Sequence, residues 1–108
     1  MTLRLYLLQR VTAALMVPLI AAHLAVIIYA SHSGLSAAEI LGRTRGSVGW
    51  AAFYGLFVLL VSVHGAIGVR SVAADWTPLR GRALGALMWV FGLLLFLLGA
   101  RAVHAVIG

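Results

Sequence analysis

The chain is organised as three long apolar runs joined by short polar connections. Asp, Glu, Lys and Arg are absent from residues 11–30, 46–69 and 83–100. Even the shortest run would extend about 27 Å as a helix, close to the hydrocarbon thickness of a bilayer. Only helices and closed barrels satisfy the backbone in lipid, and no segment alternates as a barrel strand does. The pattern therefore predicts an all-α membrane protein with three transmembrane helices over about 5–30, 46–74 and 81–106.

The two connections between these helices differ in character. The first carries Ser36-Ala-Ala-Glu39, a capping-box pattern that predicts a short surface helix over about 37–41, ended by Gly42. The second contains Pro78, which ends the second long helix. Neither connection is long enough to hold a soluble domain.

Composition agrees with the hydropathy pattern. Of the 108 residues, 64% are hydrophobic and 9% are charged, a balance that excludes a soluble domain of this size. No internal repeat divides the chain, so residues 1–108 are interpreted as one multi-pass membrane domain. The first run could also be a secretory signal peptide, but its 20-residue length and the internal His23 argue against this.

The net charge of +6 comes with eight basic residues, all arginine, that flank the apolar runs. A nucleic-acid-binding protein would gather them on one solvated face, so no nucleic-acid partner is expected. If the N-terminus is cytoplasmic, five arginines lie inside and three outside, which favours an N-in, C-out orientation. The inside set is Arg4, Arg10, Arg70, Arg80 and Arg82; the outside set is Arg43, Arg45 and Arg101.

The second run places an imidazole deep in an apolar helix and a carboxylate where that helix ends. His64, Gly68, Ser71 and Asp75 share one helical stripe, and His64 and Asp75 are separated by about 16 Å along the axis. An ionisable group inside hydrocarbon marks a functional site by default. Because the chain has no Cys, a redox cofactor would be held through His or Met.

Two interpretations of His64 remain open at this point. It is either a packing histidine bonded to neighbouring hydroxyls or carbonyls, or the axial ligand of a haem. Gly65 and Gly68 would leave room for a flat porphyrin beside the imidazole, although small residues also mark close helix packing. His23, which lies about 20 Å beyond Arg10 along the first helix, is interpreted as a packing histidine bonded to a neighbouring helix.

Four further residues are candidates for a site near the predicted inner surface. Arg10 is either a snorkelling anchor or a guanidinium partner for a haem propionate or a quinone carbonyl. Tyr6 precedes it by one turn, and both Tyr6 and Trp76 also suit an interfacial aromatic belt. Asp75 is either an ordinary acid at a helix end or, beside Arg10 and Arg70, a member of the ion pair of a proton inlet.

Two motifs resemble a known family. Gln9-Arg10-Val11-Thr12-Ala13, followed by Pro18-Leu19, resembles the opening of the hydrophobic anchor subunits of succinate dehydrogenase (respiratory complex II). The segment His64-x3-Gly68-x-Arg70-x4-Asp75-Trp76 is similar to the haem-ligand helix of these subunits. Arg70 is more like the other anchor subunit, the cytochrome b large chain. The order, spacing and three-helix plan agree over most of the chain.

The resemblance implies one half of a two-subunit, haem-binding helical bundle in a bacterial-type inner membrane. Its expected partners are a second three-helix subunit, an iron–sulfur subunit and a flavoprotein. The chain would be a non-catalytic anchor that passes electrons of the tricarboxylic acid cycle to ubiquinone or menaquinone. His64 would be an axial ligand of haem b, with the other ligand on the partner subunit.

The same resemblance implies further roles near the haem and the quinone. Arg10 and Arg70 would lie near the haem propionates and the quinone, and Tyr6, Asp75 and Trp76 would belong to the quinone pocket. In this family, the motif position that Trp76 occupies here is often a Tyr. His23 resembles the ligand of an outer haem in anchors that carry two.

Other classes fit the same hydropathy. A quinol:fumarate reductase anchor shares this architecture, and a haem-free structural anchor needs only the apolar helices. A small multidrug-type transporter has similar length, but it would carry an intramembrane carboxylate for proton coupling. None of the three runs contains one.

Overall fold

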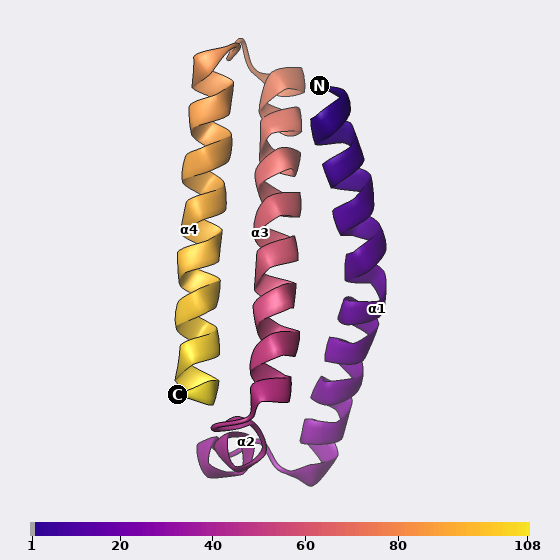
Figure 1. Ribbon diagram of the computed structural model, residues 1–108, viewed down its shortest axis with the longest axis vertical. Coiled ribbons are helices and arrows are strands. Elements are labelled where there is room, and N and C mark those ends of the chain that lie inside the picture. Colours follow the sequence, from indigo (N-terminus) through magenta and orange to yellow (C-terminus); the bar gives the residue numbers. More distant parts are fainter. Residues whose placement is uncertain (1) are drawn as a thin grey trace.

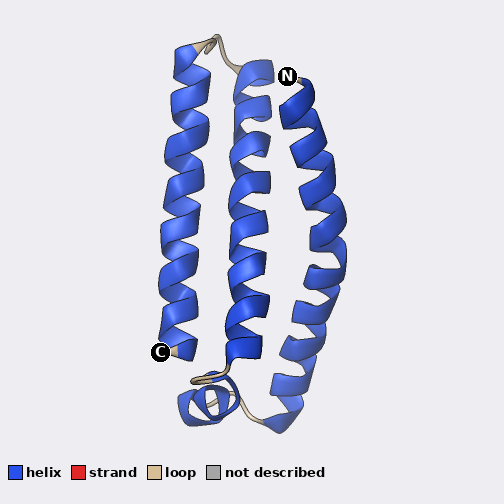
Figure 2. Ribbon diagram, in the orientation of Figure 1, coloured by secondary structure: helices blue, strands red, loops and turns tan. Residues whose placement is uncertain are grey.

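The computed structural model describes residues 2–108, which form four helices and, within that range, no strand. The three long helices lie side by side in one layer, with α3 between α1 and α4 (Figure 1). The short α2 crosses one end of the layer, as the all-helical view in Figure 2 also shows. The bounds are α1 Leu3–Ser33, α2 Ala37–Thr44, α3 Val48–Trp76 and α4 Arg82–Ile107. The predicted all-α class with three membrane-spanning helices is confirmed, because α1, α3 and α4 are each long and apolar enough to cross a bilayer.

The helix ends follow the capping signals in the sequence. The Ser36 hydroxyl accepts a hydrogen bond from the backbone N–H of Glu39 at 3.2 Å, and Ser47 does the same for Trp50 at 3.2 Å. At the other connection Gly81 adopts φ 64°, a conformation that favours glycine, immediately before α4 begins. The two serine caps satisfy backbone donors that a helix leaves unpaired at its N-terminus, whereas Gly81 makes no such side-chain bond.

The surface helix α2 continues through Gly42 to Thr44, beyond the expected end at residue 41. Its last turn is held by the end of α4: the Thr44 hydroxyl donates to the carbonyl of Val106 at 2.7 Å, and the Gly46 N–H donates to the carbonyl of Ile107 at 2.8 Å. Tertiary hydrogen bonds thus offset the low helix propensity of glycine.

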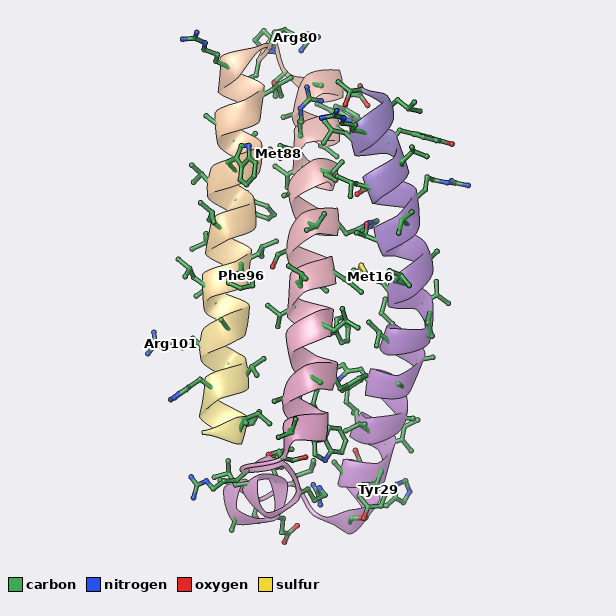
Figure 3. All side chains as sticks on the ribbon, in the orientation of Figure 1. Met16, Tyr29, Arg80, Met88, Phe96 and Arg101 are labelled. Carbon is green, nitrogen blue, oxygen red and sulfur yellow. The ribbon has the colours of Figure 1, made fainter. Side chains whose placement is uncertain are left out.

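The layer has two chemically distinct ends. Its N-terminal end holds the start of α1, the end of α3 and the start of α4, and its opposite end holds α2 and the C-terminus (Figure 1). Arg80 lies at the N-terminal end and Arg101 toward the opposite end (Figure 3). The five and three arginines counted from the sequence are therefore separated in space as expected, and the N-in, C-out orientation stays a prediction.

Small residues allow α3 and α4 to approach closely. A Cβ atom at Gly92 would lie 2.9 Å from the Cβ of Ala66, and one at Gly99 would lie 2.5 Å from a methyl group of Val58. Both distances are shorter than van der Waals contact. The closest packing in the layer therefore requires glycine on α4.

We expect Gly92→Leu to weaken the packing of α3 on α4 by about 1–3 kcal/mol, because Ala66 has no rotamer that would move its Cβ away. Thermal unfolding of the detergent-purified protein measures the change. Gly85→Leu is the matched control on the same helix, because no atom lies within 4 Å of the Cβ position at Gly85. Equal melting temperatures for the two variants would contradict the assignment.

Candidate functional site

A groove of about 690 Å³ runs along one face of the layer, and His64 lies in it. The floor is α3, one wall is contributed by α1, and the other wall by α4. The volume is within the range of about 300–1,000 Å³ typical of cofactor and ligand pockets. The lining residues, called here the His64 groove, are Gln9, His64, Gly65, Gly68, Val69, Val72, Ala73, Trp76, Thr77, Phe91 and Leu95.

The imidazole of His64 is anchored to the neighbouring helix. Its Nδ1 lies 3.2 Å from the hydroxyl oxygen of Thr12 on α1. The same hydroxyl lies 2.7 Å from the carbonyl oxygen of Leu8. Thr12 is only 4% exposed, which makes it the most deeply buried polar side chain in residues 2–108. His64 therefore has a fixed orientation between α1 and α3.

The two glycines beside His64 serve different purposes. A Cβ at Gly65 would lie 2.9 Å from Cδ1 of Leu95, so the missing side chain makes room for α4. A Cβ at Gly68 would meet only the Nε2 atom of Gln9, at an ordinary contact distance of 3.6 Å. Close helix packing explains Gly65, whereas Gly68 keeps the floor of the groove flat.

Two buried polar atoms near this groove have no hydrogen-bond partner within residues 2–108, Oε1 of Gln9 and Oγ of Ser71. Gln9 also lines the groove. A buried amide oxygen costs free energy unless it is paired, so Gln9 is suited to a ligand or an ordered water. The sequence offered a signal for this residue, because Gln9 and Thr12 are uncharged polar residues about one helical turn apart on the same face of α1.

At the N-terminal end the structure brings Trp76 to the groove but separates other candidates from it. Trp76 lines the groove while its side chain is 84% exposed. Asp75 is exposed beside it and does not line the groove. The two residues lie where a partner surface or the headgroup region would meet the layer.

Tyr6 and Arg10 form a pair of their own on α1. The Arg10 guanidinium carbon lies 6.0 Å from the Tyr6 ring centroid, and both side chains are exposed. Arg70 is half-buried and lies about 120° around α3 from His64. As far as residues 2–108 show, none of these three side chains lines the His64 groove.

His23 lies in a second cavity of about 410 Å³, nearer the opposite end. Its ring makes edge contacts with Tyr54 at 6.0 Å and with Phe57 at 5.4 Å. The buried Nδ1 of His23 has no hydrogen-bond partner within residues 2–108, so the bond expected of a packing histidine is not formed there. Leu95 lines both the His23 cavity and the His64 groove. The remaining two histidines, His32 and His104, are exposed.

The donor set fits a haem better than a free metal ion. Across residues 2–108 no three His, Asp or Glu side chains gather in a way that could hold an ion. A haem iron takes its equatorial ligands from the porphyrin and needs only axial ligands from protein. The ring of His64 is anchored by Thr12, and Gly68 leaves the floor of the groove flat beside it. His64 therefore meets the requirement for one axial ligand.

The fold and this groove together define a membrane protein with three spanning helices and a groove that holds a half-buried histidine. The profile of the succinate dehydrogenase/fumarate reductase transmembrane subunit family matches residues 1–100, and the chain belongs to that family. No curated protein and no solved structure matches the chain.

Proposed function

We propose that the chain is the membrane anchor of a succinate:quinone oxidoreductase, in which His64 binds haem b through Nε2. The observation that carries this proposal is the hydrogen bond between His64 Nδ1 and Thr12, which leaves the other ring nitrogen for iron. When bound, the haem would supply a one-electron redox centre within the membrane. His64 would hold it, and Gly68 would keep space for the macrocycle.

The groove supplies one axial histidine, so the second axial ligand of the haem would come from outside this groove. A second three-helix subunit facing the His64 groove would provide it and would bury the exposed side of the layer. At the N-terminal end the layer would dock an iron–sulfur subunit, and through it a flavoprotein. Family membership makes these partners plausible, and the orientation would place this end at the cytoplasmic face of a bacterial-type inner membrane.

The quinone site would form at the same end. Trp76 provides an apolar wall in the groove, and Asp75 stands next to it with access to water. Tyr6 and Arg10 would reach the quinone or a haem propionate across the partner interface, because they are exposed and do not line the groove in this chain. Arg70 would serve a propionate in the same way. Ubiquinone or menaquinone would be the acceptor.

His23 supports a second, outer haem as an additional proposal. Its unpaired Nδ1 and the adjacent cavity are the observations in favour. A carrier there would lie toward the opposite side of the membrane from the quinone site, so electrons would cross the bilayer. A quinol:fumarate reductase would use the same residues in the reverse direction.

The purified complex tests the proposal directly. We expect the full-length chain to copurify with a second membrane subunit and two soluble redox subunits, and a dithionite-reduced minus oxidised spectrum to show a b-type band. Haem quantification separates one haem from two. A complete complex with a flat difference spectrum would support a haem-free structural anchor instead, and a lone chain that binds haem through both His23 and His64 would contradict the two-subunit site.

A further inference from the structure

Thr12 determines which nitrogen of His64 carries the proton. A threonine hydroxyl has one proton to donate. The Thr12 oxygen lies 2.7 Å from the carbonyl oxygen of Leu8 and 3.1 Å from that of Gln9, and both of these groups only accept hydrogen bonds. If the proton were directed at His64 instead, two oxygens would face each other at 2.7 Å with no proton between them.

The hydroxyl therefore donates to the backbone of its own helix and accepts from His64. The ring nitrogen Nδ1, at 3.2 Å, must then carry a proton. A neutral imidazole has one N–H, so Nε2 keeps its lone pair. The direction of this short chain, from His64 Nδ1–H to Thr12 to the carbonyl of Leu8, is imposed by the helical backbone of α1.

We infer that Thr12 is a positioning residue for the iron ligand: it selects the Nδ1–H tautomer of His64, orients the ring and strengthens its donation through Nε2. This inference rests on the haem ligation proposed above. A histidine ligand whose second nitrogen donates a hydrogen bond is a more basic ligand and favours ferric iron. Thr12 is 4% exposed, so water cannot replace its hydroxyl without rearrangement of the packing between α1 and α3.

The test compares three variants in the intact, purified complex. Thr12→Val removes the hydroxyl and keeps the shape, whereas Thr12→Ser keeps the hydroxyl. Ser31→Ala is the control on the same helix, because the Ser31 hydroxyl also donates to the carbonyl four residues earlier, that of Ile27, and Ser31 lines neither the His64 groove nor the His23 cavity. The readouts are the midpoint potential of the haem, the electron paramagnetic resonance g-values of its ferric form, and the rate of haem loss to apomyoglobin.

We expect Thr12→Val to raise the midpoint potential by about 28–59 mV, which is a threefold to tenfold loss of preference for the ferric state in a one-electron couple. Haem retention should fall by about 10–100-fold, the usual effect of removing such a partner. Thr12→Ser should restore most of both values, and Ser31→Ala should change neither.

Two outcomes would overturn the inference. One is a midpoint potential and g-values in Thr12→Val equal to those of the wild type, and the other is a Ser variant that behaves as the Val variant does. If haem is present in the wild type and lost in His64→Ala while Thr12→Val has no effect, the role of Thr12 is wrong and the ligation by His64 stands. If His64→Ala retains its haem, the proposed function itself fails.

Discussion

His64→Ala is expected to abolish the b-type absorption of the assembled complex. The variant removes the imidazole that the groove holds in place, and among residues 2–108 no other histidine or methionine lines the groove. Loss of a direct ligand should exceed the effect of losing its hydrogen-bond partner, so haem content per complex should fall at least about tenfold. The pyridine haemochrome assay, normalised to the amount of this chain in the purified sample, measures this loss.

Controls distinguish loss of the ligand from loss of assembly. His104→Ala removes an exposed histidine and should leave the spectrum unchanged. His23→Ala removes the other half-buried imidazole: a loss of half the haem would support a two-haem anchor, and no loss would leave His23 as a packing residue among Tyr54 and Phe57. Full haem content in His64→Ala, with an unaltered ferric spectrum, would remove this residue from the site.

The second large effect is expected at the quinone site. Asp75→Leu and Arg10→Leu should depress quinone reduction by about tenfold or more, because the first removes a water-accessible proton relay and the second a cation that stabilises charge developing on a quinone oxygen. Succinate oxidation by an artificial dye should be largely retained, since the dye takes electrons before the membrane site. The ratio of the two activities is the measurement.

Matched variants make the result specific to this end of the layer. Arg101→Leu removes an arginine near the opposite end and should leave the activity ratio at the wild-type value. Asp75→Asn keeps the shape of the side chain and should resemble Asp75→Leu if proton transfer is the function of Asp75. Equal loss of both activities would assign Arg10 and Asp75 to subunit docking, and normal quinone turnover would exclude them from the site.

The sequence alone predicts the main features of the fold, namely the number of long helices and their approximate bounds. Charge-free runs long enough to cross hydrocarbon predict helices because no other local structure satisfies the backbone in lipid. The bounds of these helices follow from residues that act locally, such as Ser36 and Ser47 as caps and Pro78 as a breaker. The depth of His64 within its helix also follows from simple counting along the chain.

The sequence could not predict which way each helix is rotated about its own axis. The helices α1 and α3 are apolar on all sides, so no amphipathic stripe marks the face that meets a neighbour. Packing sets that rotation, and with it the contact between Thr12 and His64, the filling of the space at Gly65 by Leu95, and the separation of Arg10 from the groove. The extension of α2 to Thr44 has a similar origin, because its stabilising hydrogen bonds come from Val106 and Ile107, about sixty residues further along the chain.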